Sequence, residues 1–179
     1  MLRLETPSVE IYDEKTGLFA TTKKQIISLE HSLVSVSKWE SKWKKPFLTK
    51  GAKTREETID YVRCMVVTPN VDSATITVLA NRYMGDIFEY IESEMTATKL
   101  RNDTQTTSRE IITSEVIYYW MVAFNIPFEC EKWHLNRLLT LINVCNIKSS
   151  PPKKMSAKDI ASRNRELNEA RKRKLQTGG

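Results

Sequence analysis

The spacing of apolar residues changes once along this 179-residue chain, near Ser32, and this change constrains the fold more than any other feature. Before it, the runs VEIY and LFATT lie on either side of Gly17, which indicates a β-hairpin, and QIISLEH is a further strand candidate. After it, Leu33, Val36 and Trp39 recur at three-residue steps, a spacing that places side chains on one helical face. We therefore predict a mainly α fold: a helical domain with a small N-terminal β element of two or three short strands and a detached basic C-terminal helix.

Two capping boxes mark the starts of predicted helices. Thr54 and Glu57 begin the segment REETIDYVRCMVV, and Thr107 and Glu110 begin REIITSEVIYYWMVAFN. In such a box, the two side chains each accept a bond from a backbone N–H that the first helical turn leaves free. Between these segments, a helix is predicted over Asp86–Glu94, and TKLRNDTQTTS is predicted to be an exposed loop because it carries almost no apolar residues.

The positive charge of the chain is concentrated at its C-terminal end. From Lys153 to Lys174 there are nine basic and three acidic residues, and their net charge of +6 equals that of the whole chain. The preceding Pro151-Pro152 interrupts any helix, since proline lacks the backbone N–H and restricts the residue before it. We therefore predict two parts: a mainly helical body over 1–150 that contains the β element, and a basic tail over 151–179 that is helical or disordered.

Two segments have the composition of partner-binding helices. Apolar and aromatic residues occupy nearly every side of the helix predicted from Val116 to Phe124, and a helix of this kind is either buried or faces another subunit. The tail has little apolar content, with Ile160 and Leu167 seven residues apart among charges, so it gains little by folding against the body. The candidate partner-binding residues are therefore Val116, Tyr119, Trp120, Phe124, Ile160, Arg163, Arg165, Leu167, Arg171, Lys172, Arg173 and Lys174.

The stretch PFECEKWHLNRLLTLINVC, residues 127–145, concentrates reactive side chains without the pattern of an active site. On a helix that starts near Glu129, Cys130 and His134 lie one turn apart, but a zinc site requires four ligands, or three and a water molecule. A catalytic thiol–imidazole pair needs an orienting group and an oxyanion site, and no nearby residue indicates either. Cys145 falls on the apolar face of the same helix and is interpreted as a small core residue.

The chain lacks the glycine-rich and nucleophile motifs of nucleotide-binding and hydrolytic enzymes, and it contains only five glycines. We therefore predict a protein that is not an enzyme and that has no catalytic residue, cofactor or metal site. No run approaches the roughly 18 apolar residues that a membrane span requires, so no membrane partner is expected. Three widely spaced cysteines and a charged N-terminal stretch lead us to expect an intracellular protein.

Nucleic acid is the main competing partner at two places. Trp39 and Trp43 alternate with lysines in SKWESKWKKPF, as in surfaces that stack on single strands, but their spacing favours a core-facing helix whose lysines coat the other side. The basic tail can bind either phosphates or an acidic protein surface. Because Asp159, Glu166 and Glu169 interrupt its positive run, a protein partner is slightly favoured over nucleic acid.

Three stretches together resemble proteins encoded in the tail-gene region of long-tailed, siphovirus-type bacteriophages, which are taken to be tail assembly chaperones: SLEHSLVSVSKWESKWKKPFL, EVIYYWMVAFNIPFECEKWHLNRLLTLINVC and PPKKMSAKDIASRNRELNEARK. The resemblance spans residues 29–174. It implies a non-enzymatic, mostly helical factor in the host cell cytoplasm that coats the tape-measure protein and presents it to the tail-tube protein, and it leaves self-association open. The alternatives are a structural phage component, such as a head–tail connector or minor tail protein, a nucleic-acid-binding accessory protein that acts through the basic tail, and, as a contrast, a thiol or zinc enzyme.

Overall fold

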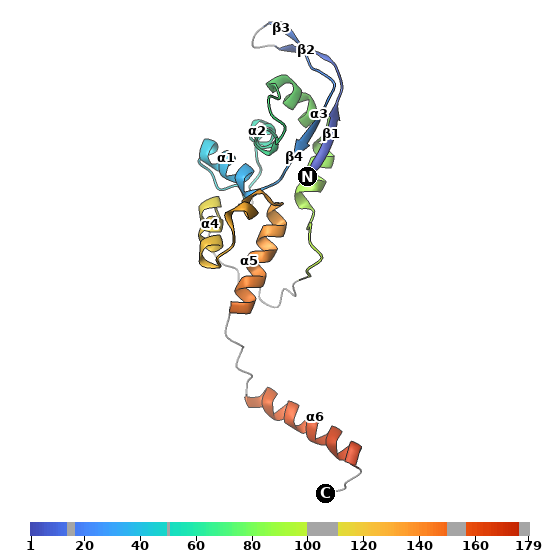
Figure 1. The fold of residues 1–179 in the computed structure, drawn as a ribbon, viewed down its shortest axis with the longest axis vertical. Helices are drawn as coiled ribbons and strands as arrows, with labels where there is room; N and C mark the ends of the chain where they lie inside the picture. Colours follow the sequence, from blue (N-terminus) through green and yellow to red (C-terminus); the bar gives the residue numbers. More distant parts are fainter. Residues whose placement is uncertain (14–16, 50, 100–110, 150–156, 176–179) are drawn as a thin grey trace. The chain divides into compact units, whose positions relative to one another are not determined.

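The computed structural model of this chain confirms the predicted fold class, since six α-helices of the described residues follow a small N-terminal β element (Figure 1). The structure describes residues 1–13, 17–49, 51–99, 111–149 and 157–175. By their internal contacts, the chain's residues form two compact units, Met1–Asn146 and Ile147–Gly179. The first unit contains the β element and the hydrophobic core, and the second contains the basic C-terminal helix.

The β element is a long hairpin that is interrupted in the middle. Strand β1 (Leu2–Thr6) pairs antiparallel with β4 (Gln25–Leu29), and β2 (Glu10–Asp13) pairs antiparallel with β3 (Leu18–Thr21). The described residues therefore contain four strands where two or three were predicted, and β1 is the strand that the sequence pattern did not single out. Five residues are too few for alternation to stand out, and the partner of β1 lies far along the chain.

Pro7 accounts for the interruption, because proline lacks the N–H that a ladder requires. The hydroxyl of buried Thr22 donates to the carbonyl of Pro7 at 2.9 Å and accepts from the amide of Val9 at 3.0 Å. The amide of Thr22 also donates to the carbonyl of Val9 at 2.9 Å. Thr22 therefore bridges the gap between the two ladders.

One face of the β1–β4 ladder covers the core. Leu4, Ile27 and Leu29 are buried on that face, whereas Ile26 is exposed on the other, as the two-residue period of a strand requires. Strand β1 packs against helix α3 (Ser73–Glu92), as Figure 1 shows. The hairpin thus forms one wall of the helical body.

Apolar spacing predicted the first helix correctly, and a capping box predicted the second. Helix α1 (Leu33–Trp43) begins with a capping box and ends at Lys44, whose φ of 55° is left-handed. Helix α2 (Arg55–Met65) begins with the predicted box. In that box, the Thr54 hydroxyl accepts from the amide of Glu57 at 3.2 Å, and the Glu57 carboxylate accepts from the amide of Thr54 at 2.8 Å.

Helix α3 is longer than predicted. It starts at Ser73 rather than at Asp86, with Asp72 as its N-cap, and it bends at Tyr83, whose φ and ψ of −119° and 23° are not helical. Its first half is rich in β-branched residues, which lower helix propensity, so no clear pattern is visible there. Burial of an apolar face that includes Leu79 outweighs this weak propensity.

Helix α4 (Ser114–Ala123) begins later than predicted. The residues just before it, 111–113, are not helical, so the helix does not continue back toward Thr107. The capping box predicted for Thr107 and Glu110 lies outside the described residues, as does most of the predicted loop TKLRNDTQTTS. Thr113 is the observed N-cap.

Residues 127–145 do not form a single helix, so the prediction of a helix that starts near Glu129 was wrong. A 3₁₀ helix, η1 (Phe128–Lys132), comes first, and α5 (Leu135–Ser149) begins only after His134. The first amide of α5 donates to a backbone carbonyl just before α1, at 2.7 Å. Because the backbone bonds to a distant segment at this point, it leaves the helical conformation.

The hydrophobic core of the first unit receives side chains from the β1–β4 ladder and from the helices around it. Its largest fully buried members come from β4 and from helices α1 to α5, and they include Trp39, Ile27, Met65 and Leu79. Core packing therefore fixes the orientation of these helices and decides which of their faces remain exposed.

The basic C-terminal segment is helical in the second unit, where it forms α6 (Ala157–Leu175). Its last turn carries three basic residues, which interact favourably with the negative end of the helix dipole. Within the described ranges, none of the helices is both long enough and apolar enough to cross a membrane.

Candidate functional site

Helix α4 buries one side and exposes apolar side chains on the other. Met121 is fully buried in the core, whereas Tyr119 and Val122 are 68% and 59% exposed. Phe128 of η1 is 56% exposed, and its ring centroid lies 6.3 Å from that of Tyr118. We call this set of side chains the α4 surface; it consists of the exposed Tyr119, Val122 and Phe128 and of half-buried Tyr118, whose ring lies beside that of Phe128.

The structure divides the partner-binding residues that the sequence predicted on this helix. Tyr119 is exposed and belongs to the α4 surface. Val116, Trp120 and Phe124 are half-buried, and the two aromatic residues pack against the core, so less of their area is open to a partner. Sequence reasoning missed Phe128 because it precedes the predicted start of the next helix.

Acidic residues accompany the α4 surface. The Tyr118 hydroxyl donates to the carboxylate of Glu131 at 2.8 Å, and burial together with this bond raises the pKa of Tyr118. Glu115 stands one turn before Tyr119, and hydrogen bonds from its own backbone and from Thr113 lower the pKa of its carboxyl group. The α4 surface therefore combines exposed rings with negative charge, which suits an apolar partner that also carries basic groups.

Helix α6 exposes every side chain that the structure describes from Ile160 to Leu175. Ile160 and Leu167 are each 46% exposed and lie seven residues apart on one side of the helix. All the partner-binding residues predicted on this helix are exposed: Ile160, Arg163, Arg165, Leu167, Arg171, Lys172, Arg173 and Lys174. The helix is thus a basic segment with a narrow apolar stripe.

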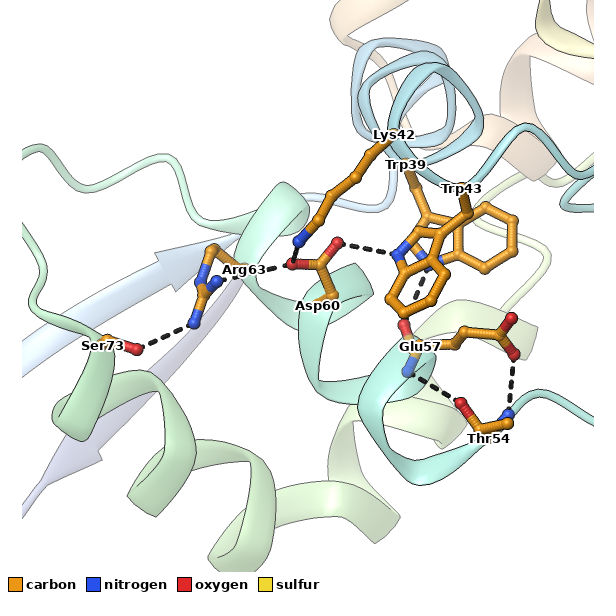
Figure 2. A network of polar contacts seen from close by, with 8 residues as sticks. All are labelled: Trp39, Lys42, Trp43, Thr54, Glu57, Asp60, Arg63 and Ser73. Atoms are coloured by element: carbon orange, nitrogen blue, oxygen red, sulfur yellow. Dashed lines mark hydrogen bonds and ion pairs between the residues drawn. The ribbon is translucent and has the colours of Figure 1, made fainter. Parts of the chain in front are cut away.

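In the tryptophan–lysine segment Trp39 belongs to the core, and this confirms its core interpretation. Its ring is 1% exposed, and its Nε1–H donates to the carbonyl of Glu57 at 2.9 Å. Trp43 donates its own Nε1–H to Asp60 at 2.9 Å, and Lys42 pairs with the same carboxylate (Figure 2). A ring buried against α2 has no free face on which a base can stack.

Two carboxylates of α2 join this helix to its neighbours. Asp60 also binds Arg63 at 3.5 Å, and this guanidinium donates to Ser73 of α3 at 2.8 Å (Figure 2). Glu57 accepts from Lys45 and from the backbone amide at the N-cap, and both bonds lower the pKa of its carboxyl group. These charges therefore hold α1, α2 and α3 together.

The reactive side chains of residues 127–145 have separate structural partners. Cys130 is buried in η1, whereas Nε2 of His134 bonds to the backbone carbonyl of Tyr90 at 2.9 Å. Cys145 is half-buried and packs against the core. In the part of the chain that the structure describes, no group of three or more His, Cys, Asp or Glu residues could hold a metal ion.

Sequence reasoning missed a contact between the two histidines of the chain. The ring centroids of His31 and His134 lie 5.1 Å apart, and both side chains are buried. Nδ1 of His31 forms a hydrogen bond with the Tyr61 hydroxyl at 2.5 Å. Burial lowers the pKa of both imidazoles, to about 3 for His31, so both rings are neutral at pH 7. No local sequence pattern indicates this pair, because the two histidines belong to distant segments.

No protein-family model matches this chain, and no curated protein or solved structure matches it. A proposal about its function therefore has to rest on its own structure. This is a mainly α protein with exposed aromatic side chains on and beside α4 and with a basic helix, α6.

Proposed function

We propose that this protein is a non-enzymatic tail assembly chaperone of a long-tailed bacteriophage, which binds the tape-measure protein and the tail-tube protein in the host cell cytoplasm. The observation that carries this proposal is the α4 surface, where aromatic rings stand exposed on a helix whose other side is buried. The resemblance of residues 29–174 to phage tail assembly chaperones supports the biological setting.

The α4 surface has the chemistry needed to cover an apolar client. A long helix with an exposed apolar face is prone to aggregate until another surface covers it. Tyrosine and phenylalanine bury large areas with only two rotatable side-chain bonds, so they bind with little loss of conformational entropy. Helix α6 offers a second contact, in which Ile160 and Leu167 meet apolar groups while the basic residues attract acidic ones.

The double variant Tyr119→Ser/Val122→Ser tests the α4 surface. Both side chains are more than half exposed, so the melting temperature is expected to change by no more than about 2 °C. The chain is co-expressed with the tape-measure protein, and the soluble fraction of that client is measured. We expect the soluble fraction to fall to the level reached without any chaperone.

Phe19→Ser provides a matched control, because Phe19 is 71% exposed on β3 and outside the α4 surface. This control is expected to keep the client as soluble as the parent does. If the α4 variant also keeps the client soluble, the proposal that α4 holds the client is wrong. Mass spectrometry of purified virions separates a chaperone, which is depleted from the finished particle, from a structural component, which remains in it.

Truncation after Ser150 tests the contribution of the basic helix. The hydrophobic core lies within Met1–Asn146, so the shortened chain is expected to keep its melting temperature to within about 2 °C. Client binding is expected to weaken, with only a moderate dependence on salt in the full chain, because apolar side chains share the contact. Affinity for nucleic acid that falls by about a thousandfold or more between about 50 and 200 mM salt, and vanishes on truncation, would instead assign α6 to nucleic acid.

A further inference from the structure

A pocket of about 330 Å³ opens between α2 and α3, beside the segment that joins α1 to α2. Tyr61 and Val62 line it from α2, and Lys53 lines it from the joining segment. The pocket shares no residue with the α4 surface, and the proposed chaperone role makes no use of it. It therefore requires an explanation of its own.

The α3 wall of this pocket has the spacing of a helix face. Met84, Ile87, Phe88 and Ile91 follow one another at i, i+3, i+4 and i+7, which covers about 10 Å of helix. The stripe begins immediately after the bend at Tyr83, so the bend separates this part of α3 from the first half of the helix. Two turns of a partner helix present apolar side chains over the same length.

The pocket is open on one side, which favours a peptide over a small molecule. Phe88 is 48% exposed although it lines the pocket, so a ligand held there would keep part of its own surface in water. Small-molecule sites, by contrast, usually enclose about 70–90% of the ligand surface. A helix that lies in a groove buries one face and leaves the other in solvent, which fits an open pocket.

Lys53 gives the pocket a charge that the described residues do not neutralise by an ion pair. Its half-buried ammonium lies 4.2 Å from the ring centroid of Phe47 and 5.7 Å from that of Trp39, and it donates to the carbonyl of Phe47 at 2.8 Å. Burial lowers the pKa of Lys53, although the charge of Glu57 opposes this effect. Both oxygens of that carboxylate already serve Lys45 and a backbone amide. An additional carboxylate at Lys53 would therefore gain a partly desolvated cation as its partner.

We propose that this pocket binds a short amphipathic helix of a partner protein, which lays bulky apolar side chains along α3 and places a carboxylate at Lys53. Glu92 also lines the pocket, at the last residue of α3, and it is exposed. Its negative charge disfavours further carboxylates of the ligand beside it. The ligand is thus a helix with an apolar stripe and acidic residues grouped where they reach Lys53.

The test uses a fluorescein-labelled synthetic helix of about fifteen residues, with leucines at i, i+3, i+4 and i+7 and glutamates at one end. Fluorescence anisotropy measures its affinity for the full chain, and a second peptide carries glutamine in place of each glutamate. We expect Lys53→Gln to weaken binding of the glutamate peptide about tenfold and to leave the glutamine peptide unaffected. Phe88→Ser is expected to weaken both peptides about tenfold, because it removes half-exposed apolar area from the wall of the pocket.

Two matched variants control for a change of charge or of exposed apolar area elsewhere. Lys38→Gln removes an exposed lysine of α1, and Phe19→Ser removes an exposed phenylalanine of β3, and neither residue lines the pocket. Both variants are expected to bind the peptides as the parent does. Equal losses in Phe88→Ser and Phe19→Ser would overturn the assignment to this pocket. Equal affinity of the parent for the two peptides would overturn the role of Lys53.

A free apolar carboxylic acid also combines apolar groups with a carboxylate, and dodecanoate is the probe that tests this alternative ligand. Saturable binding of dodecanoate that depends on Lys53 and Phe88, without binding of either peptide, would overturn the proposal of a partner helix. Because the probes are synthetic, the result does not depend on the chaperone role. The pocket can therefore bind its peptide whether or not the α4 surface binds the tape-measure protein, and each proposal can fail alone.

Discussion

Trp39→Ala is expected to lower the free energy of unfolding by about 3–5 kcal/mol, the usual cost of removing a large buried aromatic side chain. The ring is 1% exposed, and its centroid lies 5.2 Å from that of Phe47 in an edge-to-face contact. Its Nε1–H donates to the carbonyl of Glu57, so alanine also removes a hydrogen-bond donor from this buried acceptor. The loss therefore combines a cavity with a broken bond between α1 and α2.

Urea unfolding followed by circular dichroism measures this loss, and Trp39→Phe separates its two causes. Phenylalanine keeps most of the buried area and removes the indole N–H, so we expect a smaller cost of about 1–2 kcal/mol. A Trp39→Ala protein that unfolds at the parent's urea concentration would contradict the burial of this ring. If that protein had also lost affinity for single-stranded nucleic acid, the alternative that Trp39 stacks on bases would be restored.

The elements that sequence reasoning predicted well are those with a local signal. The capping box of Thr54 and Glu57 determines the start of α2 from residues three positions apart. Leu33, Val36 and Trp39, at three-residue steps, indicated α1, which spans Leu33–Trp43. These signals act within one or two helical turns, so a single segment of sequence contains them.

The elements that it predicted poorly depend on contacts between distant segments. The first half of α3 has weak helix propensity and is helical because its apolar face is buried. The break before α5 follows from a backbone bond to the carbonyl of His31, which no residue near His134 indicates. The same break explains why the sequence did not indicate Phe128. Because the chain forms η1 before α5, Phe128 lies in η1, and its ring is near that of Tyr118.

The two histidines show the same limit at the level of side chains. His31 follows β4 and His134 precedes α5, so the two residues lie far apart in the sequence. The Lys53 pocket is a second case, because α2, α3 and the joining segment each contribute one wall. Charges and apolar residues can be counted from the sequence, but their grouping into sites requires the fold.

Acid is expected to destabilise the folded protein through this buried histidine pair. Burial, and to a lesser extent the charge of His134, lower the pKa of His31 from 6.5 to about 3. Between these two pH values the unfolded chain binds a proton at this position and the folded chain does not. Stability is therefore fully present above pH 6.5 and is lost as the pH falls, by about 1.4 kcal/mol per pH unit.

Between pH 6.5 and 4.5, the effect of histidine protonation on stability can be separated from that of carboxyl protonation. Ordinary glutamates take up protons only near pH 4.5, and the pKa of Glu57 is lowered further by its bond to Lys45. Over this range His31 alone is expected to remove about 2–3 kcal/mol of stability. His134 adds to the loss, because burial lowers the pKa of its imidazole against the opposing effects of the Tyr90 carbonyl and of Glu30.

The variant His31→Gln makes this prediction specific, because glutamine does not titrate and its amide can still bond to the Tyr61 hydroxyl. Near pH 7 the variant is expected to be less stable than the parent, since the amide fills less of the core than the imidazole. Its free energy of unfolding is expected to change much less between pH 6.5 and 4.5, so the two stability curves converge as the pH falls. Urea unfolding at a series of pH values measures both curves, and NMR titration of the His31 ring gives its pKa in the folded state. A folded-state pKa near 6.5 would show that the ring is solvated, and a parent curve that is flat over this range would rule out the histidine pair as the cause of acid sensitivity.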